Sequence, residues 1–179
     1  MAESPRVAPL TVDDIPALLP HLVRNALESG RDGEPFSRAR SADDPPDTSA
    51  IAERLAVTWA RPVDVPGWER GFGLWVGGEL RGHLDLIGGE IESELHRAHL
   101  GMGIERPYRR AGWGSRLLGD AITWARGAGL AWIDLGVFTH NAPAHALYVK
   151  HGFVEVGVTV DRVRIDGQSL DDRAMVLRL

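Results

Sequence analysis

The chain of 179 residues contains no cysteine, and Lys150 is its only lysine. Without cysteine there can be no disulfide, no thiolate metal site and no covalent cysteine nucleophile. We also expect no metal at the functional site. No run of apolar residues approaches the length of a membrane span. The first residues, "MAESPRVAPLTVDD", lack the apolar stretch of a signal peptide. These absences predict a cytoplasmic enzyme or binding protein with no membrane partner.

Acidic residues outnumber basic ones, 25 to 20, which gives a formal net charge of −5. This balance argues against nucleic acid as an electrostatic partner. A hydrophobic content of 44% and a charged content of 25% are ordinary for a globular protein. The length suits a single domain covering residues 1–179.

Hydrophobic periodicity and turn residues predict a mixed α/β chain. A hairpin is expected over 71–89, because two runs typical of strands flank Gly77-Gly78. The strand at 130–138 is mostly apolar, as expected if both of its faces are buried. Asp13 or Asp14 is expected to cap the first helix, and Thr48 or Ser49 the second. The other predicted strands are 6–11, 98–104, 153–165 and 174–179, and the predicted helices are 15–27, 48–60, 114–126 and 141–151.

Residues 28–47 form a long polar stretch, rich in Gly and Pro, with no periodicity. Its acidic residues would favour a cationic acceptor if it covered a binding site, and otherwise it is a solvated loop. They are Glu34, Asp43, Asp44 and Asp47.

The segment "RPYRRAGWGSRLL", residues 106–118, gathers four arginines and two glycines between a strand and a helix. The first amides of a helix have no internal partner and point toward any anion placed there. Gly112 and Gly114 leave room for a phosphate to approach the backbone. The spacing therefore predicts a polyphosphate site, with a tight turn and solvated arginines as the alternative. It is not a P-loop, because no Gly-Lys-Ser/Thr follows.

The run Arg109-Arg110-Ala111-Gly112-Trp113-Gly114 resembles the Arg/Gln-x-x-Gly-x-Gly/Ala motif of the GNAT acetyltransferase superfamily. A second stretch, "NAPAHALYVKHGF", is similar to the segment that follows that family's fifth strand. The resemblance implies an α/β fold of the α+β type: a mixed, mostly antiparallel seven-stranded sheet with splayed central parallel strands and flanking helices. Arg110 and Trp113 depart from the family's usual glycine and small aliphatic residue.

The resemblance also implies acetyl-CoA as a co-substrate. Its pantetheine would lie along Met102, Gly103 and Ile104, and Asn141 would contact the cofactor or the acceptor. The pyrophosphate would lie against the segment formed by Arg109, Arg110, Ala111, Gly112, Trp113, Gly114 and Ser115. Gly101 and Gly103 are expected to allow a close approach to the strand.

Tyr148 matches the family's general acid beside the thioester sulfur, although a tyrosine at this spacing is also an ordinary packed aromatic. The position of the family's general base differs in this chain, because His99 stands where many relatives have Glu. A neutral His can accept a proton near pH 7. His83, Asp85, Glu92 and Glu94 compete for this role, and a water molecule would also serve.

These residues predict an N-acetyltransferase that moves an acetyl group directly to a primary amine of a small molecule or peptide, since no cysteine exists to carry it. The alternatives are a non-catalytic acyl-CoA-binding module on the same fold and, more remotely, an adenine-nucleotide protein. Specificity is expected in the first two helices, the 28–47 stretch and the last hairpin. A homodimer is possible.

Overall fold

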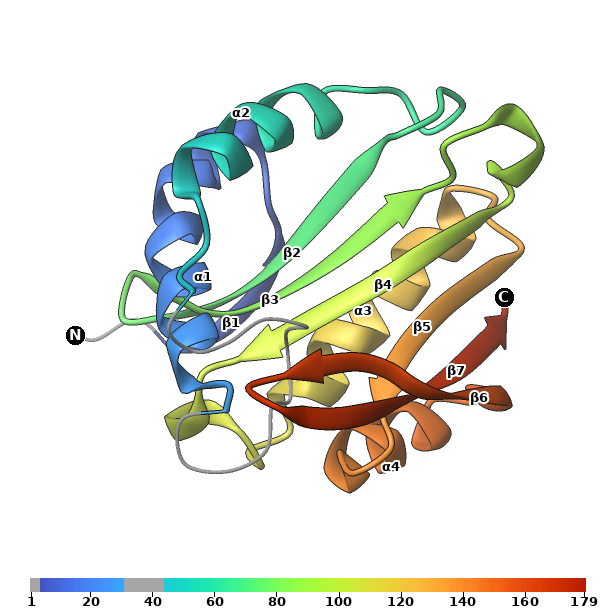
Figure 1. Cartoon of the computed structure of the whole chain (residues 1–179). Coiled ribbons are helices and arrows are strands. Elements are labelled where there is room, and N and C mark those ends of the chain that lie inside the picture. The colour runs from blue at the N-terminus through green and yellow to red at the C-terminus, as the bar shows by residue number, and fades with distance from the viewer. Residues whose placement is uncertain (1–3, 31–43) are drawn as a thin grey trace.

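The structure, a computed structural model, describes residues 4–30 and 44–179. Seven strands form one sheet in the order β1-β2-β3-β4-β5-β7-β6 (Figure 1). The strands are β1 (Arg6–Pro9), β2 (Glu69–Val76), β3 (Glu79–Gly88), β4 (Arg97–Ile104), β5 (Trp132–Phe138), β6 (Val154–Ile165) and β7 (Gln168–Arg178). The α-helices are α1 (Ile15–Glu28), α2 (Thr48–Thr58), α3 (Trp113–Gly127) and α4 (Ala142–Lys150). The predicted order of elements is confirmed.

Two helix starts differ from the sequence prediction. Asp47, not Thr48 or Ser49, caps α2: its carboxylate accepts the backbone N–H groups of Ser49 and Ala50. Before α1, a short 3₁₀ turn (Val12–Asp14) is closed by the Asp14 carboxylate, which accepts the backbone N–H and the hydroxyl of Thr11. Asp14 remains the residue before α1, but its side chain caps no α1 amide.

The β2–β3 hairpin turns at Gly77 and Gly78, as predicted, and both glycines have positive φ. All neighbouring strands are antiparallel except β4 and β5, which are parallel. These two pair only over Arg97–His99 and Trp132–Asp134. Beyond His99 the strands separate, so the splay expected from the resemblance is present. Among residues 4–30 and 44–179, the edge of β4 that faces β5 has no strand partner from Leu100 to Ile104.

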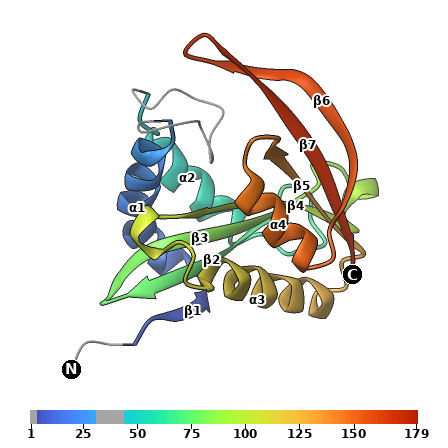
Figure 2. The same cartoon turned by 90° about the horizontal axis from the view of Figure 1, so that it is seen from below.

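The helices lie on both faces of the sheet (Figure 2). α1 and α2 cover one face of the β2–β3 half, and α3 lies on the opposite face. Most buried apolar side chains pack between the sheet and α3, including Leu117, Leu118 and Ala121. A smaller cluster lies under α1 and α2 around Leu18, Leu55 and Trp59. The side chains of β5 alternate between the two sides, and Ile133, Leu135 and Val137 are buried while Gly136 is exposed. The prediction that both faces of this strand are buried is therefore wrong.

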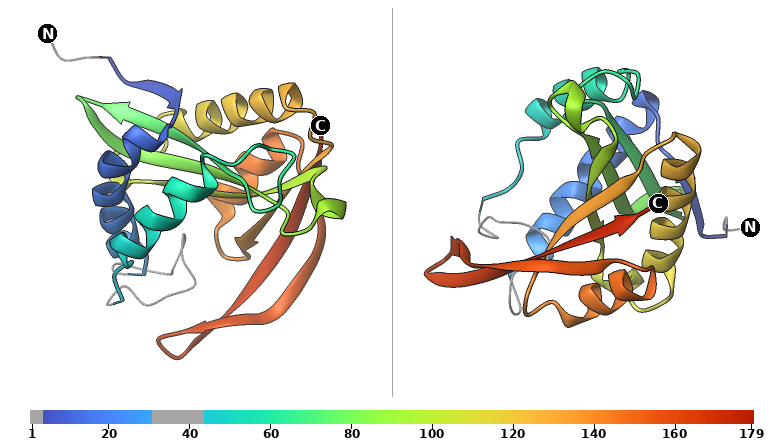
Figure 3. Two further views of the ribbon diagram at one scale, coloured as in Figure 1. Left: turned by 90° about the horizontal axis from the view of Figure 1, so that it is seen from above. Right: turned by 90° about the vertical axis from the view of Figure 1, so that its right-hand side faces the viewer.

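The β6–β7 hairpin bends out of the sheet toward the side that α1 and α2 cover (Figure 3). β7 begins at Gln168, six residues before the predicted start, because the polar run 168–173 pairs with both β6 and β5. In the parts of the chain that the structure describes, no helix is long and apolar enough to cross a membrane.

Candidate acetyl-transfer site

A cavity of about 1360 Å³ runs along β4, past the start of α3 and between α4 and the β6–β7 hairpin. It collects residues from β4, α3, β5, α4, β6 and β7, which the sequence separates widely. Eleven of the predicted site residues line it: His99, Met102, Gly103, Ile104, Arg109, Arg110, Gly112, Gly114, Ser115, Asn141 and Tyr148. Ala111 and Trp113 do not.

The start of α3 offers unpaired amides to this cavity. Gly112 precedes the helix with a φ of 85°, and its carbonyl accepts the N–H of Arg116 at 3.1 Å. The N–H groups of Trp113, Gly114 and Ser115 come before that first helical bond and have no carbonyl inside the helix to reach. The positive end of the helix dipole adds to their attraction for an anion.

Arg110 also has a left-handed backbone, with a φ of 63°. That conformation costs a residue with a side chain roughly 1 kcal/mol and costs glycine almost nothing. The finding explains why a glycine is usual where this chain has Arg110. It also means that the turn keeps its shape, and its exposed amides, despite the substitution.

Arg109 does not offer its guanidinium to a phosphate in the way the sequence suggested. Its Nε donates to the carbonyl of Ile104 at 2.6 Å, and its other nitrogen donates to the Glu28 carboxylate at 2.9 Å. Glu28 also accepts the backbone N–H of Arg106 at 2.7 Å. The segment 106–118 contains no acidic residue of its own, but α1 brings Glu28 to it. Burial lowers the pKa of Arg109, and Glu28 opposes that shift.

Two other residues of the motif have structural partners. Trp113 packs against the main apolar core. The Ser115 hydroxyl lies 2.7 Å from Nε2 of His151. Ala111 is exposed at the turn.

The glycines of β4 differ in what their missing side chains permit. A Cβ on Gly103 would lie 2.4 Å from Oδ1 of Asn25, so this glycine makes room for α1. A Cβ on Gly101 would meet nothing within 4 Å among the described residues. The expected close approach of the cofactor to the strand at Gly101 and Gly103 stays a prediction. No bulge interrupts the pairing of β3 with β4 at either residue.

Tyr148 lies on α4 with its side chain buried against Phe153, the two ring centres being 5.7 Å apart. Burial raises the pKa of Tyr148 to about 12, so the phenol stays protonated at physiological pH. Within residues 4–30 and 44–179 its hydroxyl has no hydrogen-bond partner, although the residue lines the cavity. Asn141 caps α4, as predicted, by accepting the N–H of Ala144 at 3.3 Å.

His99 is exposed on the cavity side of β4, at the last pair before the strands separate. Two charged residues that the sequence gave no reason to select lie in the same part of the cavity. Asp172 comes from β7 and Arg162 from β6. Burial raises the pKa of Asp172, whereas electrostatic interaction with Arg162 and His99 opposes that shift. Both residues lie in the hairpin where specificity was expected.

The other candidates for the base lie elsewhere. Glu92 and Glu94 are exposed in a 3₁₀ turn before β4 and do not line the cavity. His83 and Asp85 lie on the face of β3 covered by α1 and α2, and neither lines the cavity. Asp134 accepts two hydrogen bonds from Arg97, each 2.7 Å long, and so has a structural role.

His83 belongs to a buried polar row that sequence reasoning missed. Glu105 lies 2.8 Å from Nδ1 of His21, and Nε2 of His21 lies 2.8 Å from Nδ1 of His83. Burial would raise the pKa of Glu105, but hydrogen bonds from His21 and Arg24 lower it below its usual value. Burial lowers the pKa of both histidines to about 4. The row ties α1 to the residue that follows β4.

Glu34 and Asp43 lie outside the described residues. Asp47 is occupied as the cap of α2, so it is not available to attract an acceptor in the way that the sequence allowed.

The geometry of the cavity is suited to binding coenzyme A. The unpaired edge of β4 leads directly into the turn that exposes the first amides of α3. An extended amide-containing arm can pair with such an edge, and a pyrophosphate suits such a helix start. A Cβ on Gly114 would lie 3.2 Å from the side chain of Leu147, so glycine at this position lets the start of α3 lie close to α4.

Solved structures of similar fold define the class of protein as an acetyltransferase. A GNAT acetyltransferase from Streptococcus pneumoniae is 25% identical, with a TM-score of 0.85, and the match covers 98% of this chain and 100% of that one. The structure of yncA from Salmonella typhimurium, solved with its cofactor acetyl-CoA, is 16% identical with a TM-score of 0.79, over 99% and 95% of the two chains. A ribosomal-protein-alanine N-acetyltransferase from Brucella melitensis has a TM-score of 0.78 at 22% identity, over 97% and 99%.

The pattern of the Acetyltransferase (GNAT) family matches residues 37–153, and the chain belongs to this family. It is an acyltransferase that uses acetyl-CoA. Among curated proteins, the Bacillus subtilis "Putative phosphinothricin acetyltransferase YwnH" is 34% identical over 74 residues. That match spans 41% of this chain and 45% of the relative.

Proposed function

We propose that this acetyltransferase moves the acetyl group of acetyl-CoA directly to the primary amine of a small molecule or peptide. One observation carries the proposal: the unpaired edge of β4, the amides at the start of α3 and the Tyr148 hydroxyl all open into one cavity. The relatives' names include both a small-molecule acceptor and a ribosomal protein, so they support either kind of amine.

Acetyl-CoA supplies the acetyl thioester, and the chain's own groups act around it. The amines at the start of the reaction are mostly protonated near pH 7. His99, exposed on the cavity side of β4, accepts the proton that the amine must lose. The amine nitrogen then forms a bond to the acetyl carbon as the carbon–sulfur bond breaks. A backbone N–H on the unpaired edge of β4 stabilises the carbonyl oxygen.

Tyr148 donates a hydrogen bond to the sulfur as it leaves. With its pKa near 12 against about 8.5 for a thiol, complete transfer of the phenol proton would be uphill by roughly 5 kcal/mol. Stabilising the thiolate by a hydrogen bond requires no such transfer. The nitrogen releases its second proton to solvent as the amide forms, and the thiolate takes up the proton held by His99, so the products are the amide, the free thiol and one proton.

The proposal is tested by following the release of free CoA thiol with a panel of amines: free amino acids, amino-acid amides, short peptides, a polyamine and an aminoglycoside. We expect turnover of at least one class that requires both substrates. Binding of acetyl-CoA with no thiol release beyond hydrolysis, for every amine, would contradict the proposal and leave the non-catalytic module as the better interpretation.

A further inference from the structure

The hairpin side of the cavity carries two opposite charges whose placement the fold specifies in detail. We propose that Arg162 and Asp172 select an acceptor that is a small zwitterion, with an anionic group held by Arg162 and the reacting amine placed between Asp172 and His99. The inference rests on the proposed function and narrows its acceptor to a free amino acid or a compound of the same charge pattern, in preference to a peptide amino terminus.

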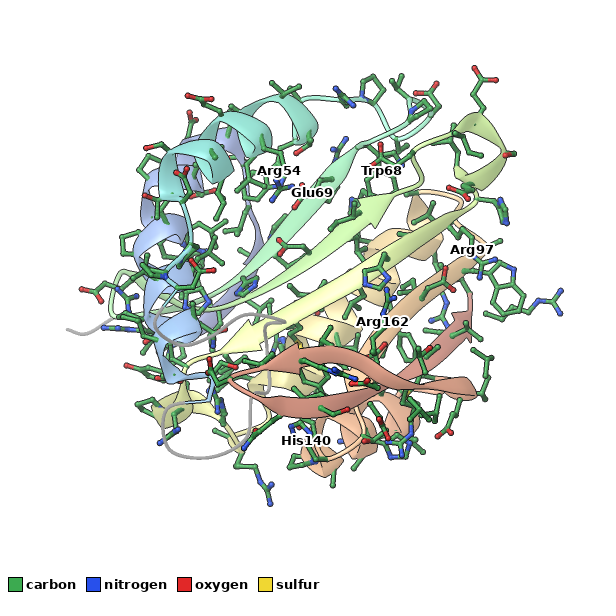
Figure 4. All side chains as sticks on the ribbon, viewed as in Figure 1. Arg54, Trp68, Glu69, Arg97, His140 and Arg162 are labelled. Atoms are coloured by element: carbon green, nitrogen blue, oxygen red, sulfur yellow. The ribbon has the colours of Figure 1, made fainter. Side chains whose placement is uncertain are left out.

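A break in the β6–β7 ladder places Arg162. After an earlier register shift between Glu155 and Gly157, pairing runs to Thr159 with Asp172 and resumes at Val163 with Leu170, so residues 160–162 form a bulge. Bulges of this kind re-aim side chains and are frequent beside active sites. Arg162 and Val163 line the cavity, whereas Val160 has 74% of its surface exposed. In Figure 4 Arg162 lies on the side of the hairpin that faces β4.

Asp161 holds the bulge in place. Its φ is 52°, a conformation that is uncommon for a residue with a side chain. Its N–H donates to the Asp171 carboxylate at 2.8 Å. Its own carboxylate accepts Nε of Arg164 at 3.0 Å and the Ser169 hydroxyl at 2.6 Å. The hydrogen bonds of Asp161 with Asp171, Arg164 and Ser169 thus stabilise the turn that directs Arg162. Arg162 itself takes part in none of them.

A glycine on β5 places Asp172. A Cβ on Gly136 would lie 2.7 Å from Oδ2 and 3.0 Å from Oδ1 of Asp172, so the carboxylate lies directly over this strand. From there it faces the splay between β4 and β5, where His99 ends the paired region. Any other residue at position 136 would push the carboxylate away from that position.

Three charged or titratable side chains of the cavity make no structural contact through their polar groups in the described fold. Within residues 4–30 and 44–179, Arg162, Asp172 and His99 make no side-chain hydrogen bond and no ion pair within 4 Å. They influence one another only through their charges. An unpaired arginine and an unpaired carboxylate in one cavity match a ligand with the opposite arrangement of charges. A peptide amino terminus brings an amine but no anionic group close to it.

The experiment compares matched acceptors that differ only in the anionic group. Thiol release is measured with free amino acids and with their α-amides, for the wild type, Arg162→Gln and the control Arg178→Gln, which removes an exposed arginine from the end of the same hairpin. The wild type should prefer the zwitterion over its amide by about tenfold or more. Arg162→Gln should raise the KM for zwitterions by about 10- to 100-fold and change the KM for amides and for acetyl-CoA little, as expected for the loss of one charge-assisted contact. Arg178→Gln should behave as the wild type.

A second variant keeps the Arg162 guanidinium and weakens the hydrogen bonds that stabilise the bulge around it. Asp161→Gly accepts the positive φ but removes the carboxylate that holds Arg164 and Ser169, so it should raise the KM for zwitterions less than Arg162→Gln does. Circular dichroism and thermal unfolding check that both variants fold.

Three results would overturn the inference. A wild type that turns over amides or peptides but not zwitterions would assign a different acceptor while leaving the proposed function intact. An Arg162→Gln variant that raises only the KM for acetyl-CoA would place Arg162 at the cofactor. Turnover of no amine at all would remove the proposed function and this inference with it.

Discussion

The carboxylate of Glu28 on α1 accepts a hydrogen bond of 2.9 Å from the side chain of Arg109, 81 residues further along the chain. The same oxygen accepts the backbone N–H of Arg106 at 2.7 Å. The end of α1 therefore holds the turn that leads into α3. Arg109 contributes to this site by shaping the turn, and the α3 amides remain exposed for the pyrophosphate.

Removing this carboxylate should weaken cofactor binding. Glu28→Ala leaves Arg109 and the Arg106 amide without their shared acceptor, so the turn loosens. Both side chains are about one quarter exposed, so we expect the Kd for acetyl-CoA to rise only about three- to tenfold. Titration calorimetry measures this. Glu53→Ala, which removes an exposed glutamate from α2, is the control and should leave the Kd unchanged.

A substitution of Arg110, the left-handed residue in the motif, separates the contribution of the backbone amides to cofactor binding from that of the Arg110 side chain. Arg110→Gly should raise the unfolding free energy by about 0.5–1 kcal/mol, because glycine adopts a φ of 63° without strain. The Kd for acetyl-CoA should stay within about threefold, since the backbone that holds the pyrophosphate is unchanged. A Kd more than tenfold higher would show that the Arg110 side chain, and not the turn, binds the cofactor.

Replacing the buried phenol should affect turnover more than binding. Tyr148→Phe keeps the ring against Phe153 and removes only the hydroxyl, so we expect kcat to fall by about 10²-fold with little change in the KM for acetyl-CoA. Because burial raises the pKa of Tyr148 to about 12, the wild type should show no loss of kcat from tyrosine ionisation below about pH 11. Tyr108→Phe, which changes the other tyrosine, is the matched control. Equal turnover in Tyr148→Phe and the wild type would remove Tyr148 from the mechanism.

The close approach of Asp172 to β5 can be tested without a large effect on folding. Gly136→Ala places a methyl group where the Asp172 carboxylate lies, and the carboxylate can move because it is the end of a side chain. Thermal stability should therefore change little, while kcat/KM for the acceptor falls by about tenfold or more. Gly157→Ala adds a methyl group to open space on β6 and should change neither. A Gly136→Ala variant with full activity would show that the position of Asp172 does not matter.

The buried carboxylate on β3 should make stability depend on pH. Burial raises the pKa of Asp85 to about 7, whereas Arg54 opposes this shift, and His83 Nε2 lies 3.7 Å away. Between about pH 4 and 7 the folded chain binds a proton at Asp85 that the unfolded chain releases, so this group's contribution to stability falls as pH rises.

Asp85→Asn should therefore stabilise the protein by about 1–3 kcal/mol at pH 8 and change it little at pH 4.5. Urea unfolding at the two pH values measures the difference, and an equal effect at both would contradict the assigned protonation. The lowered pKa values of His21 and His83 work in the other direction, since their contribution is lost as pH falls from 6.5 toward 4.

Local signals predicted the order of strands and helices, and the position of the cofactor site that they indicate stays a prediction. The Gly77-Gly78 turn, the Asn141 cap and the glycines before α3 all depend on residues that are close in the sequence. The polar start of β7 was missed because its pairing with β5 and β6 decides it, and no periodicity reports that pairing.

The same limit applies to the site. Glu28 reaches Arg109, and Gly136 makes room for Asp172, only through tertiary contacts, so neither relationship could be seen in a motif. The orientation of Arg162 depends on a bulge that Asp161 stabilises. The presence of an aspartate in a predicted strand does not by itself indicate such a bulge. The single domain, the homodimer and the catalytic roles of Tyr148 and His99 stay predictions.

The most direct measurement is a crystal structure of the wild type with coenzyme A bound. The account predicts that the pyrophosphate lies against the N–H groups of Trp113, Gly114 and Ser115, with the pantetheine along β4 and the sulfur within hydrogen-bonding reach of the Tyr148 hydroxyl. A pyrophosphate bound away from α3, or a sulfur directed away from Tyr148, would contradict it.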